Sequence, residues 1–111
     1  MCGITGIFAF NLVGKFNMIN LANATMMLEK RGPDHQAIYS DQFAGLGHRR
    51  LSIIDTSAAA NQPMWDNANR YGIIFNGEIF NFQELRTELE GKGIFFSTHS
   101  DTEVLDRKSV V

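Results

Sequence analysis

The chain has 111 residues, a formal net charge of −2 and an apolar content of 44%. This length allows one small domain, or part of one, and is too short for two independent cores. Lys and Arg form no cluster, so we expect no nucleic-acid partner. Apolar stretches of membrane-spanning length and a signal-peptide pattern are both lacking, so we expect no membrane association and a cytoplasmic location.

The cysteine and histidine content limits the chemistry further. Cys2 is the one cysteine, so an internal disulfide is excluded. The three histidines, at positions 35, 48 and 99, lack metal-ligand spacing, and no glycine-rich phosphate loop is present. We therefore expect no metal site and no cofactor within these residues, and we interpret His48 and His99 as structural.

The first half of the chain predicts a strand, a helix and further short strands. Residues 3–10 are rich in β-branched and aromatic residues, which favours a strand. Apolar residues recur at helical spacing over residues 17–31, and Gly32-Pro33 predicts an abrupt stop. Two short apolar runs, 37–39 and 51–54, separated by glycines, are typical of strands.

The second half predicts a loop followed by strands and helices. Residues 56–69 are polar and predict a loop, and residues 71–75 a strand. Asn81 is a suitable N-cap for a second helix that ends at Gly91 or Gly93. A strand over 94–96 and a capping-box start to a third helix follow; the box residues are Ser100 and Glu103. This order predicts an α+β fold with antiparallel sheets covered by helices.

The last six residues differ in pattern from the rest. Residues 106–111 neither continue the amphipathic helix nor supply a C-cap. Back-translated as GAT CGG AAG AGC GTC GTG, they reproduce the start of a common sequencing adapter. We interpret residues 1–105 as protein sequence and residues 106–111 as a translated adapter tail. Recovery of the same codons by a different library chemistry would contradict this.

Cys2 has two interpretations. It is either a terminal thiol without a role or, once Met1 is removed, a nucleophile beside a free α-amino group. That amine, with a pKa near ~8, takes the thiol proton directly or through a water, so one residue supplies both nucleophile and base.

Five further residues each allow a purely structural and a functional interpretation. Asn76-Gly77 is typical of a type I′ hairpin turn, but an Asn amide and a Gly N–H also suit an oxyanion. Arg50 is either a solvated strand-end charge or a bidentate partner for a carboxylate. Glu78 and Asp101 are either a loop and a helix-start carboxylate or partners for an ammonium group.

Six blocks, in this order, resemble the glutaminase domain of glutamine-hydrolysing asparagine synthetases. They are MCGITGIF at 1–8, RGPD at 31–34, GHRRLSIID at 47–55, QP at 62–63, FNGEIFNFQELR at 75–86 and SDTEVL at 100–105. The resemblance implies a class II glutamine amidotransferase of the N-terminal-nucleophile hydrolase type. Its fold would be a four-layer αββα sandwich, incomplete in this chain.

The resemblance also implies roles for residues. Cys2 would attack the side-chain amide of L-glutamine to form a thioester, and Asn76 and Gly77 would bind the oxyanion. The residues implied to bind glutamine are Arg50 at the carboxylate, Leu51, Ile53 and Ile54 along the wall, Asn76 and Gly77 at the amide, and Glu78 and Asp101 at the ammonium group.

What lies outside these residues is also implied by the resemblance. The intact protein would continue into a synthetase domain that binds ATP, Mg²⁺ and aspartate, and the full-length protein would form a homodimer. Two alternatives stay open. The chain is a non-catalytic fragment or glutamine-binding module, or it is the glutaminase part of a related amidotransferase with another acceptor.

Overall fold

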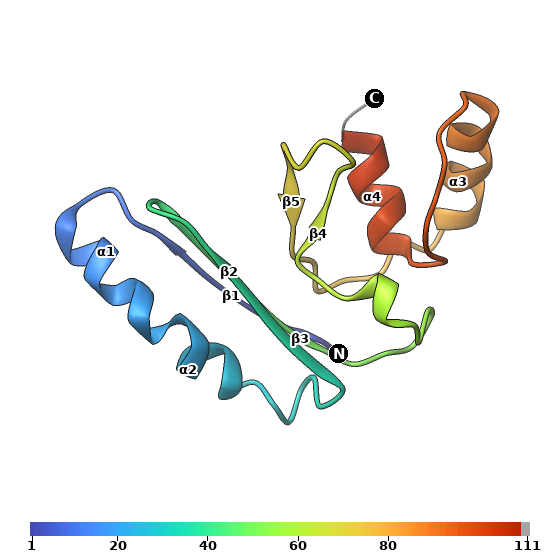
Figure 1. The fold of residues 1–111 in the computed structure, drawn as a ribbon. Coiled ribbons are helices and arrows are strands. Elements are labelled where there is room, and N and C mark those ends of the chain that lie inside the picture. The colour runs from blue at the N-terminus through green and yellow to red at the C-terminus, as the bar shows by residue number, and fades with distance from the viewer. Residues whose placement is uncertain (110–111) are drawn as a thin grey trace.

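The chain adopts a small mixed α/β fold in a computed structural model that describes residues 1–109. Figure 1 shows two parts, a long sheet with a helical layer on one side and a smaller group of strands and helices. The elements are β1 (Gly3–Phe8), α1 (Leu12–Asn17), the 3₁₀ turn η1 (Met18–Asn20), α2 (Leu21–Met26), β2 (His35–Ser40), β3 (Ala44–Arg50), the 3₁₀ turn η2 (Ala58–Ala60), β4 (Met64–Trp65), β5 (Gly72–Ile73), α3 (Phe82–Gly91) and α4 (Asp101–Ser109).

Both sheets of the described residues are antiparallel, as the sequence predicts. The larger has the order β1-β3-β2, and the smaller pairs β4 with β5. Within the larger sheet, Gly3 pairs with Arg49 and Phe8 with Ala44. This register places the N-terminus beside the end of β3.

Helix α2 packs closely on one face of β3, because two glycines leave room for it. A Cβ on Gly47 would lie 2.1 Å from Thr25 Oγ1, and a Cβ on Gly45 would lie 2.8 Å from a methyl group of Leu21. The hydroxyls of half-buried Thr5 and buried Thr25 meet at 2.7 Å. Successive strand residues point to opposite faces, so His48 points away from α2.

The predicted helix over residues 17–31 is wrong at both ends. The helical region begins at Leu12, since Asn11 is the N-cap and its side chain accepts from Gly14 N at 2.8 Å. It passes through η1 and ends at Met26. Beyond Met26 the chain forms tighter turns, with Leu28 N bonded to Thr25 O.

Two predicted strands are absent from the described residues. Residues 51–54 are irregular, because β3 ends at Arg50 and its guanidinium binds carbonyls of the chain that follows. Residues 94–96 are irregular as well, since Ile94 N bonds back to Leu89 O at the end of α3. The predicted strands at 3–10, 37–39 and 71–75 are confirmed with shifted bounds, as β1, β2 and β5. The predicted loop over 56–69 contains η2 and β4.

Both predicted helix starts in the second half are confirmed. Helix α3 follows Asn81, which holds the N-cap position without a capping hydrogen bond from its side chain. Gly93, just beyond the helix, has φ +82°, a conformation that favours glycine. At α4, Ser100 Oγ accepts from Glu103 N at 3.2 Å. The carboxylate of Glu103 binds Ser97 N and Thr98 N instead of completing the capping box.

Helix α4 continues further than the sequence pattern predicts. It runs to Ser109, with Asp106 and Arg107 buried and paired at 3.1 Å. The helical structure of 106–109 does not test whether these residues are an adapter tail, so that origin stays a prediction. Residues 110–111 of the tail lie outside the described residues.

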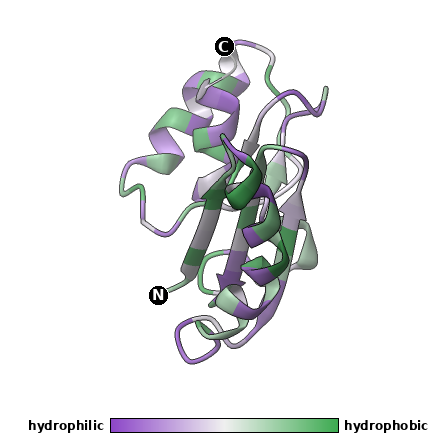
Figure 2. Cartoon of the chain, turned by 90° about the vertical axis from the view of Figure 1, so that its left-hand side faces the viewer, coloured by the Kyte–Doolittle hydropathy of each residue, from purple (hydrophilic) through white to green (hydrophobic). Residues whose placement is uncertain are grey.

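Large apolar side chains are exposed on both parts of the fold. Phe8 and Phe10 are 72% and 83% exposed, and Phe80 and Phe95 are 89% and 86% exposed. Figure 2 views the molecule from the side of α1 and α2, and green apolar residues alternate with purple polar ones along this outer layer. Apolar surface of this extent is unusual for an isolated soluble domain.

Candidate active site

A cavity of about 300 Å³ lies where the N-terminus, the end of β3 and the start of α4 meet. All nine residues predicted for the site line it. They are Cys2, Arg50, Leu51, Ile53, Ile54, Asn76, Gly77, Glu78 and Asp101. The fold therefore brings together one thiol, one guanidinium, two carboxylates and a carboxamide from four separate segments.

Cys2 lies against the chain that leaves β3. Its Sγ accepts a hydrogen bond from Leu51 N at 3.3 Å and lies 3.7 Å from Leu51 O. Arg31 Nε donates to the carbonyl oxygen of Cys2 at 3.4 Å. Met1 also lines the cavity and is 72% exposed. The sulfur is thus fixed at the cavity wall, with the chain terminus one residue away.

Arg50 is buried, which rules out its interpretation as a solvated strand-end charge. It is 6% exposed, and its Nη1 donates to Ser57 O and to Asn61 Oδ1, both at 2.7 Å. Its Nη2 donates to Asp55 O. These bonds use three of the five guanidinium hydrogens and leave Nε–H and one Nη2–H. These two hydrogens have no partner among the described residues, so this open edge of Arg50 is available to a carboxylate.

Asp55 joins two loops at the cavity and was not predicted as a site residue. Its carboxylate accepts from Ser57 N and from His99 N, both at 2.8 Å. Hydrogen bonds from the Ser57 side chain, and then from the His99 backbone, lower the pKa of Asp55 from 3.8 to about 2. The loop that binds Arg50 is therefore tied to the loop that precedes Asp101.

Asn76 and Gly77 form no hairpin turn. A type I′ turn needs positive φ at both central residues, and Gly93 is the one glycine with positive φ among the described residues. The two residues instead follow β5 in an irregular segment along the cavity. Their amide and N–H groups are therefore not committed to a hairpin ladder.

The two acidic residues differ in burial. Asp101 is 7% exposed at the first position of α4, and its Oδ2 accepts from Ile79 N at 3.0 Å. Glu78 is exposed. With Asp55, three carboxylates line the cavity beside one guanidinium, and this excess of negative charge favours a cationic group there. Ile53 and Ile54, at 72% and 44% exposed, add an apolar wall.

Sequence reasoning missed several further lining residues. They are Met1, Asp55, Ala60, Gln62, Phe75, Ser100 and Thr102. Gln62 lies within the QP block and Asp55 within the GHRRLSIID block, and these blocks indicated a resemblance without a role for either residue.

Within residues 1–109, no three His, Cys, Asp or Glu side chains are grouped as metal ligands would be. None of the described helices combines the length and the apolar character that crossing a membrane requires.

Known proteins resemble this chain along nearly its whole length. It is 45% identical over 109 residues to asparagine synthetase [glutamine-hydrolyzing] 1 of Bacillus subtilis strain 168. It is 38% identical over 109 residues to asparagine synthetase B [glutamine-hydrolyzing] of Escherichia coli strain K12. Each match covers 95% of this chain but 17% and 19% of the relative, so the chain spans less than a fifth of their length. Residues 1–108 match the glutamine amidotransferase domain model, and the chain belongs to that family.

Proposed function

We propose that this chain is the glutaminase part of a glutamine-dependent asparagine synthetase and hydrolyses L-glutamine to glutamate and ammonia. One observation carries the proposal: all nine predicted site residues line the same cavity, at Cys2 Sγ. Family membership and the names of the relatives support the same reaction.

In the proposed mechanism, removal of Met1 exposes the α-amino group of Cys2. The amine takes the thiol proton, and the sulfur attacks the side-chain carbonyl carbon of glutamine. The carbonyl oxygen becomes an oxyanion between the Asn76 amide and the Gly77 N–H. The C–N bond breaks, the proton passes to the leaving nitrogen, and ammonia departs. Water then attacks the thioester, which releases glutamate and restores the thiol.

The charged groups of the cavity suit the other end of glutamine. The open edge of Arg50 would bind the α-carboxylate, and Glu78 and Asp101 would bind the α-ammonium group. An analogue without either charge would leave these groups unpaired, so the site would select against it.

The remaining part of the protein would use the ammonia. We propose a synthetase domain that binds ATP, Mg²⁺ and aspartate, in a full-length protein that forms a cytoplasmic homodimer. The antiparallel sheets and the outer layer of α1 and α2 are compatible with part of a four-layer αββα sandwich. Further strands would then cover the exposed apolar side chains.

The test is Cys2→Ala in the full-length protein. We expect loss of glutamine-dependent amidation, with ammonia-dependent amidation unchanged, because the proposed synthetase domain does not need the thiol when ammonia is supplied. Intact mass should show that Met1 is absent. Equal loss of both activities, or a retained Met1 in active enzyme, would refute the mechanism.

A further inference from the structure

Phe75 directly precedes Asn76-Gly77, and both of its backbone polar groups are bound by side chains. Its N–H donates to Gln62 Oε1 at 2.5 Å. Its carbonyl oxygen lies 3.3 Å from His48 Nε2. The chain at this point has left β5 and has no sheet ladder. Buried backbone groups in irregular segments need other partners, and these two side chains supply them.

His48 is 0% exposed and lies on the face of β3 opposite α2. Since a carbonyl oxygen only accepts, the contact with Phe75 requires a hydrogen on Nε2. Nδ1 is buried and has no hydrogen-bond partner among the described residues. Burial lowers the pKa of His48 and outweighs the hydrogen bond to Phe75, which raises it, and the charge of Arg50 acts in the same direction as burial. These effects favour the neutral imidazole, and the contact with Phe75 assigns its hydrogen to Nε2.

Gln62 is 6% exposed and bridges two segments of the cavity. Its Oε1 accepts from Phe75 N, which assigns the amide orientation, and its Nε2 donates to Thr102 Oγ1 at 3.1 Å. Thr102 follows Asp101 in α4. Gln62 thus links the segment that carries Asn76 to the helix that carries Asp101.

We propose that His48 and Gln62 are a pair of positioning residues that fix the Phe75 backbone and so aim the Asn76 and Gly77 donors at the oxyanion. The inference rests on the proposed glutaminase function. In this role the two side chains act on the Phe75 backbone and not on glutamine. Oxyanion donors are effective only when they are preorganised, and a displacement of about 1 Å costs roughly 100-fold in rate.

The test uses variants of the full-length protein that remove the contacts of one residue at a time. His48→Leu removes the donor to Phe75, and Gln62→Met removes both amide contacts at similar length. His48→Gln retains a neutral N–H donor and is the conservative variant. Thr25→Val is the matched control, since it removes one buried hydroxyl, with its contacts to Thr5 and Leu21, on the opposite face of the sheet.

Four quantities are measured for each variant. They are kcat and KM for glutamine hydrolysis, the ammonia-dependent rate, and Ki for the γ-aldehyde analogue of glutamine. The thiol adds to the aldehyde carbon and its proton passes to the aldehyde oxygen, so the adduct occupies the oxyanion site. Ki for this inhibitor therefore measures binding at the Asn76 and Gly77 donors, whereas KM depends mainly on binding of the charged end of the substrate.

We expect His48→Leu and Gln62→Met each to lower kcat about 10- to 100-fold and to raise Ki for the aldehyde by a similar factor. KM and the ammonia-dependent rate should change less than about threefold, and His48→Gln should recover part of kcat. The double variant should cost little more than the worse single one, because both act on one residue.

Other outcomes overturn the inference. An unchanged kcat in both His48→Leu and Gln62→Met, or a rise in KM without a change in Ki for the aldehyde, would refute positioning. So would an equal loss of kcat in Thr25→Val, which would indicate general destabilisation. If Cys2→Ala keeps glutamine-dependent activity, the proposed function itself fails, and this result is independent of the positioning variants.

Discussion

Replacing Asp55 by Asn tests whether the two loops at the cavity act together. Asp55 joins the loop that binds Arg50 to the loop before Asp101, through bonds to Ser57 N and His99 N. The side-chain amide has one acceptor oxygen where the carboxylate has two, so Asp55→Asn keeps one of these bonds at most. The loops should separate more often, and glutamine should bind less tightly.

The size of the effect follows from the pKa of Asp55. A decrease in the pKa from 3.8 to about 2 corresponds to about 2.4 kcal/mol of folding stability before solvent screening is considered. Asp55 is only partly buried, so solvent screening reduces this contribution, and we expect about 1 kcal/mol. Because the folded-state pKa is depressed, the stabilisation is present above pH 3.8 and is lost as the pH falls through 2.

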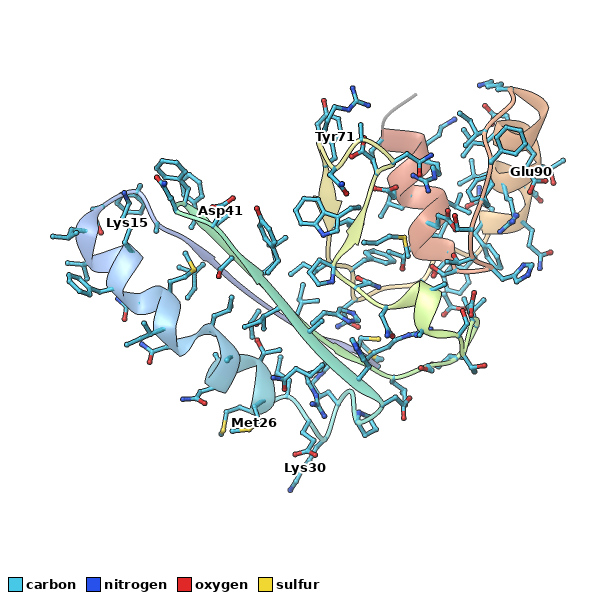
Figure 3. The ribbon with its side chains drawn as sticks, viewed as in Figure 1. Lys15, Met26, Lys30, Asp41, Tyr71 and Glu90 are labelled. Carbon is cyan, nitrogen blue, oxygen red and sulfur yellow. The ribbon has the colours of Figure 1, made fainter. Side chains whose placement is uncertain are left out.

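The assay is amide hydrogen exchange in the full-length protein, combined with KM for glutamine. A loss of about 1 kcal/mol should speed exchange of the His99 amide roughly fivefold and raise KM by a similar factor. Asp41→Asn is the matched control. Asp41 also accepts from two backbone amides, Phe43 N at 2.7 Å and Ala44 N at 2.8 Å, but it lies at the other end of the long sheet (Figure 3).

Two results would refute this reasoning. An unchanged KM in Asp55→Asn despite faster exchange at His99 would show that the loops move without affecting the substrate. An equal rise of KM in Asp41→Asn would show that the effect does not depend on the cavity.

Three further predictions concern the oxyanion site, the packing and the exposed surface. Asn76→Ala should lower glutamine-dependent kcat by roughly 10²- to 10³-fold and leave the ammonia-dependent rate unchanged; a comparable loss of both would argue against an oxyanion role. Gly32→Ala should lower the melting temperature of the full-length protein, because its Cβ would lie 2.3 Å from Arg49 O, whereas Gly91→Ala, with nothing within 4 Å, should be neutral or stabilising. The 111-residue chain expressed alone should aggregate, given the exposure of Phe8 and Phe80, and a cooperative, monodisperse thermal melt would contradict this.

Local sequence patterns predicted those features that depend on neighbouring residues. Asn81 and Ser100 precede helices, and the apolar runs at 3–10 and 37–39 lie in strands. These signals are local in the sequence: a polar residue before a helical repeat of apolar residues, and short runs rich in β-branched and aromatic residues. The prediction of a helix over 17–31 is wrong because Asn11 caps a helix that begins earlier, at Leu12. The prediction of a strand at 51–54 is wrong because Arg50 binds the chain that follows it.

The six sequence blocks nominated the site residues, and the structure brings all of those residues to one cavity. The blocks carried no information on which side chains hold the site residues in position. The contacts of Phe75 with His48 and Gln62 join positions 27 and 13 residues apart, and that of Asp55 with His99 joins positions 44 apart. Such pairs form only when the chain folds back on itself, and no local periodicity encodes them. Sequence therefore determined which groups carry the proposed chemistry, and the tertiary structure decided which buried side chains fix them in place.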